Sequence, residues 1–148
     1  MGVEENKEIV RQYIDAVFNN PDYARAKELI HEEIFGEGGE IQEFEANVKN
    51  FLAQGEKITD GRNDLLEMIA EGDKVVAVSM VSGTDVGGYF SNPPTNKKYE
   101  AKVTAIYTLK DGKIAKGDIT FNFLTIYQQI GLLPSTEEIL KAYSESQK

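Results

Sequence analysis

The 148-residue chain contains no cysteine, and it has only one histidine and four prolines. Without cysteine the chain has neither disulfides nor thiolate chemistry, and a metal site built from several histidines is excluded too. No apolar run approaches the roughly 20 residues that cross a bilayer, and the first residues, MGVEENKEIV, lack the basic and apolar regions of a signal peptide. We therefore expect a cytoplasmic protein with no metal site and no membrane partner.

Basic residues are also scarce, because 16 lysines and arginines stand against 25 aspartates and glutamates, a formal net charge of −9. A charge of this sign repels phosphate backbones, so nucleic acid is not an expected partner. A chain of this length buries roughly two-thirds of its unfolded surface in one core. We expect a single domain that spans residues 1–148.

The first half of the chain has apolar residues at helical spacing. Residues 7–18 predict a helix with Asn6 as its N-cap. A second helix is predicted after Asn20, with Pro21 in its first position, where a missing N–H costs nothing. After the glycine-rich GEGG, residues 41–55 predict a third helix.

From about residue 62 the period changes to two, which predicts strands. Residues 62–70 and 74–84, joined by the turn EGD, read as a hairpin, and residues 99–109 alternate between small or apolar and polar side chains. The pair Asp111 and Gly112 predicts a tight turn into a returning strand, and STEEILKAYSESQK predicts a terminal helix with a capping box. Leading helices followed by an antiparallel sheet predict an α+β fold with the helices on one face of the sheet.

Two stretches carry a family resemblance. The words AEGDKVVAVSMVSGTDVGGYFSNPPTNKKYEA and DGKI…YQQIGLLP, between residues 69 and 134, resemble the SnoaL-like polyketide cyclases of the nuclear-transport-factor-2-like superfamily. The resemblance implies a cone-shaped, curved antiparallel sheet that wraps around the N-terminal helices and encloses an apolar pocket. It also implies chemistry without metal or cofactor, in which an aspartate serves as acid and base for an aldol closure and histidines help to hold the enolate.

The chain departs from this pattern where the chemistry is expected. When GKI and QQIGLLP are aligned with the family without a gap, the catalytic aspartate falls on Ile119 and a family histidine falls on Gly117. A second family histidine falls near Ala105, and the histidine often found after SGT is Asp85 here. Isoleucine, glycine and alanine cannot move a proton, so the resemblance places no acid or base at these inward positions.

Asp118 is the obvious replacement for the missing aspartate. Side chains alternate across a strand, so Asp118 points away from the face of Gly117 and Ile119, toward that of Lys116. This predicts a solvated or interfacial residue. The alternative is a β-bulge that re-aims the carboxylate toward the pocket.

Two further side chains are weak catalytic candidates. His31 follows the second predicted helix, where a cation interacts well with the helix carboxyl end, and the alternative is a base or donor at the mouth of the pocket. Asp85 is predicted as a turn-former, and the alternative is a polar group at the pocket rim.

Aromatic and small residues at strand and helix spacing predict the pocket lining, although such residues are also typical of an ordinary core. The predicted lining residues are Tyr13, Phe18, Ala105, Tyr107, Gly117, Ile119 and Phe121.

Three hypotheses of function follow. The first is a protein that binds a small, mostly apolar organic molecule and has lost the cyclase acid and base, so that it is not an enzyme. The second is a cyclase, isomerase or hydratase that acts on a small carbonyl compound through His31, Asp85 or a tyrosine hydroxyl. The third is oligomerisation through the outer sheet face. A homodimer is expected under all three, because a curved sheet leaves a broad outer face to cover.

Overall fold

The computed structural model describes residues 2–31, 60–87 and 92–148. The third predicted helix, within residues 41–55, lies outside the described residues. The elements in chain order are α1 (Val3–Ile14), a π-helix (Asp15–Asn19), α2 (Tyr23–Glu28), β1 (Arg62–Glu71), β2 (Lys74–Thr84), β3 (Lys98–Lys110), β4 (Lys113–Phe121), α5 (Phe123–Gln129) and α6 (Thr136–Ser146). None of the helices formed by the described residues is long and apolar enough to cross a membrane.

The first two helices begin at other residues than their sequences predicted. Helix α1 starts at Val3 with Gly2 as its N-cap. Asn6 is instead buried inside the helix, where its Nδ2 donates to the carbonyl oxygen of Gly72 at 3.3 Å. In α2 the N-cap is Asp22, whose side chain accepts from the Arg25 backbone N–H, so Pro21 lies before the helix.

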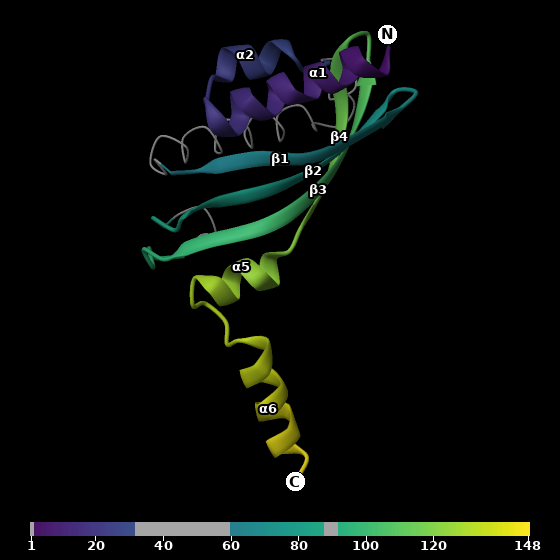
Figure 1. Cartoon of the computed structure of the whole chain (residues 1–148). Helices are drawn as coiled ribbons and strands as arrows, with labels where there is room; N and C mark the ends of the chain where they lie inside the picture. The colour runs from purple at the N-terminus through teal and green to yellow at the C-terminus, as the bar shows by residue number, and fades with distance from the viewer. Residues whose placement is uncertain (1, 32–59, 88–91) are drawn as a thin grey trace.

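The four strands form one antiparallel sheet in the order β1-β2-β3-β4, and the predicted α+β fold is confirmed. The sheet is strongly curved, with α1 and α2 on one side of it and α5 beneath β3 (Figure 1). Burial alternates along β2 and β3 as predicted. Asp111 and Gly112 both have positive φ, 51° and 73°, as a primed hairpin turn requires.

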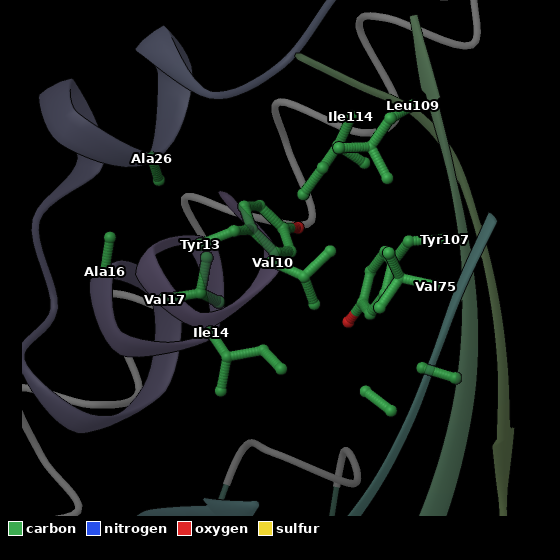
Figure 2. Close-up of a cluster of buried hydrophobic side chains, with 12 residues drawn as sticks. Val10, Tyr13, Ile14, Ala16, Val17, Ala26, Val75, Tyr107, Leu109 and Ile114 are labelled. Carbon is green, nitrogen blue, oxygen red and sulfur yellow. The ribbon is translucent and has the colours of Figure 1, made fainter. Parts of the chain in front are cut away.

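Two apolar clusters pack against the concave side of this sheet. Figure 2 shows the first, in which α1 and the π-helix face β2 and β3; its buried members are Val10, Tyr13, Ile14, Ala16, Val17, Ala26, Val75, Ala77, Ala105, Tyr107, Leu109 and Ile114. The second joins β2 and β3 to α5, and its buried members are Val81, Tyr99, Ala101, Val103, Ile126 and Ile130. The helices are therefore anchored at different parts of β3.

Side-chain amides complete the backbone pairing where strands lack a neighbour. On β1, Asn19 accepts from the backbone N–H of Asn63 at 2.8 Å and donates to its carbonyl oxygen at 2.9 Å. The start of β3 extends beyond β4, and there Gln129 of α5 accepts from the N–H of Glu100 at 2.6 Å and donates to its carbonyl oxygen at 2.8 Å. Each amide takes the place of a peptide group in a neighbouring strand.

We expect Gln129→Ala to lower the free energy of unfolding by about 1 kcal/mol, because it removes two hydrogen bonds whose partners can turn to water. Urea denaturation measures this loss. Gln128→Ala is the matched control, since Gln128 makes one exposed hydrogen bond, to Thr136 Oγ1 at 3.2 Å. Equal losses in the two variants would show that the amide pairing does not anchor α5 on β3.

Candidate functional site

The candidate site is built on three rows of the sheet that cross its concave side. Residues directly opposite in an antiparallel ladder place their side chains on the same face. The rows are Ala70, Val75, Tyr107 and Gly117; Met68, Ala77, Ala105 and Ile119; and Leu65, Ser79, Val103 and Phe121. We call these the central rows. The middle one is apolar from edge to edge, and its two central positions are alanines.

Two tyrosines meet at one border of the central rows. The rings of Tyr13 on α1 and Tyr107 on β3 pack edge to face, with centroids 5.8 Å apart, and point toward each other across the space between helix and sheet (Figure 2). Burial raises the pKa of both hydroxyls, and the neighbouring Tyr107 raises that of Tyr13 further. Both hydroxyls therefore stay protonated at neutral pH, and each can donate a hydrogen bond.

Gly117 makes room for one of these rings. A Cβ atom at this position would lie 3.4 Å from Cε1 of Tyr107, so the ring rests directly over the glycine. A long side chain here would have to displace the ring or turn away from it. The tyrosine and the glycine thus fill this part of the face together.

The opposite border of the central rows is apolar and open. Ile119, on β4 beside Ala105, is 47% exposed. The next residue on the same face, Phe121, stacks on Phe123 at a centroid distance of 5.3 Å, and Phe123 stacks on Tyr127 at 5.9 Å. An exposed isoleucine beside stacked aromatic rings gives the site an apolar edge toward solvent.

The register confirms the predicted direction of Asp118. It pairs with Ile106, on the convex face, and its Oδ2 lies 3.5 Å from Nζ of Lys116. A bulge does occur in β4, but it lies at Ala115, before Lys116, where the pairing with β3 shifts. Gly117, Ile119 and Phe121 therefore stay on the concave face, and Asp118 stays outside.

Asp85 is fully buried, and its carboxylate accepts hydrogen bonds from the loop between β2 and β3. Its Oδ1 accepts from the Gly87 N–H at 3.0 Å, and its Oδ2 accepts from Asn92 Nδ2 at 2.9 Å and from the N–H and hydroxyl of Thr95 at 3.1 and 2.8 Å. Burial alone would raise the pKa of this carboxyl, but these hydrogen bonds outweigh it and lower the pKa. This geometry matches the turn-former interpretation, and it explains the SGT and PPT words as two sides of one loop.

His31 is buried near the other end of the sheet. Its Nε2 lies 3.2 Å from Oδ2 of Asp111 in the β3–β4 turn, and its backbone N–H donates to the carbonyl oxygen of Ile114. Ile114 pairs with Leu109, which is four residues, or about 13 Å, along β3 from Ala105. The structure therefore does not bring His31 and Asp85 together, and a catalytic role for either stays a prediction.

The other predicted lining residues divide between the two borders. Tyr13, Tyr107 and Gly117 lie at the tyrosine border, and Ile119 and Phe121 lie at the open one, with Ala105 between them. Phe18 is partly buried and packs on the first cluster from the π-helix. Whether these residues contact a ligand stays a prediction.

Sequence reasoning missed the three members of the site on β2, which are Val75, Ala77 and Ser79. All three are buried, and all three belong to the central rows. The alternation within KVVAVSMVSGT could have identified them, because it places Val75, Ala77, Ser79 and Val81 on one face. The contact between Tyr13 and Tyr107 left no such signal, since it joins residues far apart in the chain.

Two open hollows on the surface are polar and lie away from the central rows. One, of ≈ 590 Å³, lies between the start of β3 and α5 and includes Asp60, Lys98 and Glu100. The other, of ≈ 300 Å³, lies beside the β3–β4 turn and includes Asp73 and Asp111. Their charged linings suit an apolar molecule less well than the central rows do.

Comparisons with known proteins agree with the fold. A family model described as SnoaL-like polyketide cyclase matches residues 7–130. Comparison with curated protein sequences gives no match.

Three similar solved structures illustrate the agreement. TsrD from Streptomyces laurentii has a TM-score of 0.76 and 20% identity, over 90% of this chain and 99% of its own. A SnoaL-like polyketide cyclase from Agrobacterium tumefaciens has a TM-score of 0.69 and 14% identity, over 88% and 100%. TerC, co-crystallised with polyporic acid, has a TM-score of 0.61 and 18% identity, over 86% and 98%. At these identities the structures show the shared fold alone.

Proposed function

Because the chain belongs to the SnoaL-like polyketide cyclase family, as its sequence words indicated, we propose that the central rows bind a small, mostly apolar organic molecule. The observation that carries the proposal is the middle row. It runs from buried Ala77 and Ala105 to Ile119, an apolar side chain that remains 47% exposed at the edge of the face. Small side chains leave space above a curved sheet, and an exposed apolar edge gains free energy when a ligand covers it.

We propose further that binding proceeds without the acid and base of the cyclase reaction. Ile119 and Gly117 lie on the central rows at the positions where the resemblance expects an aspartate and a histidine. Proton transfer needs an ionisable group within reach of the substrate, which neither side chain supplies. The carboxyl side chain of β4, that of Asp118, faces the other side of the sheet.

The buried tyrosine pair supports a second candidate function, an isomerase-like or cyclase-like enzyme for a small carbonyl compound. A protonated hydroxyl in an apolar site can donate a hydrogen bond to an oxygen that gains negative charge during enolisation. Tyr107 lies in the row next to Ala105 and would be this donor. The two candidates differ in outcome, since the first predicts that a bound compound is recovered unchanged.

A thermal-shift experiment tests binding, with polyporic acid and a panel of small aromatic ketones as probes. A ligand present at about 100 times its dissociation constant stabilises the folded state by about 2.7 kcal/mol. This raises the melting temperature of a chain this size by about 5 to 10 °C. We expect Ala105→Leu to abolish this shift, because the added atoms fill the middle row. Thr104→Leu, which makes the adjacent change on the convex face, should keep it.

Two results would contradict the binding proposal. One is a panel without any stabilising compound, and the other is an equal shift in wild type and Ala105→Leu. Chromatography of the incubated compounds distinguishes the two candidate functions. Conversion of a bound ketone by the wild type supports an enzyme, and recovery of the unchanged ketone supports binding alone.

A further inference from the structure

Asn63 on β1 is a buried amide whose oxygen has no hydrogen-bond partner. The residue is only 5% exposed. Within the described ranges 2–31, 60–87 and 92–148, no donor pairs with its Oδ1. A buried acceptor without a partner has lost its water and gained nothing in return, so it lowers the stability of the fold. Such atoms are rare in folded proteins, and a bound molecule that supplies the missing donor is one physical reason for them.

The side chain of Asn63 lies on the concave side of the sheet. Asn63 pairs with buried Val81, which pairs with buried Ala101, so these three form the row next to the central rows. Strand β1 is the edge strand beside α1 (Figure 1). The backbone of Asn63 is held on both sides, by the ladder with β2 and by the amide of Asn19. The unpaired oxygen therefore has a fixed place beside the proposed binding site.

Ser79 is the second buried polar side chain on the concave side of β1 and β2. It is 3% exposed and lies opposite Leu65, which places it diagonally from Asn63. Diagonal neighbours in an antiparallel pair are about 7 to 8 Å apart. We call Asn63 and Ser79 the polar corner. The side chains around it on the same two strands are apolar: Leu65, Met68, Ala70, Val75, Ala77 and Val81.

We propose that the molecule bound on the central rows carries a hydroxyl group that occupies the polar corner. A hydroxyl is both a donor and an acceptor, whereas an amide oxygen only accepts and a serine hydroxyl can donate. The ligand hydroxyl donates to Oδ1 of Asn63 and accepts from the hydroxyl of Ser79. This inference rests on the proposed function, because it concerns the same face of the sheet. It narrows the ligand class from a mostly apolar molecule to an apolar alcohol or phenol.

A water molecule suits the polar corner less well than this hydroxyl does. A buried water typically makes about three hydrogen bonds, and the polar corner provides two side-chain partners. A ligand hydroxyl makes the same two hydrogen bonds, while the apolar body attached to it covers the neighbouring leucine, methionine and alanine side chains. Replacement of a poorly held water by such a ligand therefore favours binding.

Titration calorimetry of the full chain with three related ketones tests the proposal. The probes are benzophenone, para-methoxybenzophenone and para-hydroxybenzophenone, of which the last alone has a hydroxyl donor. We expect the wild type to bind the hydroxyl compound about tenfold more tightly than the other two, the effect of pairing a buried acceptor. Asn63→Leu has a similar size but no acceptor, and it should lose this preference. Asp64→Leu, the matched control on the convex side of β1, should keep it.

The melting temperature of the ligand-free protein separates a binding role of Asn63 from a folding role. Asn63→Leu removes an unpaired buried acceptor, so the variant should melt about 3 °C above the wild type although it binds the hydroxyl compound more weakly. A side chain that serves the fold would give the opposite change. A lower melting temperature in Asn63→Leu would therefore overturn the assignment.

The three probes also distinguish this inference from the proposed function. If the wild type binds all three compounds equally well, the central rows remain an apolar binding site and the polar corner alone is wrong. A preference for the hydroxyl compound that persists in Asn63→Leu would equally overturn the role of the amide. If the wild type binds none of the three, the proposed function fails and the inference fails with it.

Discussion

Asp85→Ala is expected to lower the free energy of unfolding by about 3 kcal/mol, because it removes a buried acceptor shared by several donors. The substitution leaves the backbone N–H groups of Gly87 and Thr95, the Thr95 hydroxyl and the Asn92 amide without their shared acceptor. Guanidinium denaturation at neutral pH measures the loss. Asp118→Ala removes an equally charged but exposed side chain, so its unfolding curve should nearly overlie that of the wild type.

The contribution of Asp85 also has a defined pH dependence. Its pKa in the folded chain lies below the ordinary value of 3.8, so the folded state favours the ionised form. The stabilisation is therefore complete above about pH 4 and is lost as pH falls through the folded pKa. The difference in stability between wild type and Asp85→Ala should be constant from pH 5 to 8 and smaller at pH 3. A difference that stays the same at pH 3 would show that the carboxylate charge is not what holds the loop.

Tyr107→Ala is expected to lower the free energy of unfolding by about 3 to 4 kcal/mol, which is typical when a buried aromatic side chain is replaced by alanine. It removes a buried ring that contacts Tyr13 edge to face and covers Gly117. Tyr107→Phe keeps the ring and deletes only the hydroxyl, so its stability should stay within about 1 kcal/mol of wild type. Thermal denaturation of the two variants separates the packing of the ring from the role of the hydroxyl.

The same pair of variants examines the proposed site. If the Tyr107 hydroxyl donates to a ligand carbonyl, Tyr107→Phe should bind that ligand about tenfold more weakly, the effect of one lost hydrogen bond of about 1.4 kcal/mol. Titration calorimetry with a stabilising ketone from the thermal-shift panel measures this. Tyr99→Phe, near the other end of β3, is the control and should bind as the wild type does. Unchanged affinity in Tyr107→Phe would show that the Tyr107 hydroxyl does not donate to the ligand. The proposed enzymatic function would then lose the residue on which it depends.

The sheet could be predicted from sequence because its signals are local. Alternation along residues 99–109 identified the buried face of β3, and alternation together with the family register gave the opposite directions of Asp118 and Ile119. Counting from the Asp111–Gly112 turn alone would have reversed these two directions, because the extra residue Ala115 shifts the pairing with β3. Helix starts were harder. Asn6 is a good capping residue, but its side chain donates instead to the carbonyl oxygen of Gly72, 66 residues away. No local sequence pattern could reveal this contact.

The site could be predicted only in part for the same reason. Which strand residues face inward follows from a period of two, whereas the meeting of Tyr13 and Tyr107 depends on how α1 lies on the sheet. The π-helix is a similar case. It ends at Asn19, whose side chain pairs with the backbone of Asn63 on β1, a contact between segments 44 residues apart.

The amides that complete the strands also bear on aggregation. An uncovered strand edge presents free N–H and C=O groups that recruit strands from other molecules. Here Asn19 occupies the edge at Asn63, Gln129 occupies the overhang at Glu100, and the backbone of Leu29 and His31 pairs with Ile114 on β4. Each group blocks the addition of a further strand. Deamidation of Asn19 or Gln129 would replace an N–H donor by a carboxylate that repels the strand carbonyl, and would turn a protected edge into a template for fibril growth.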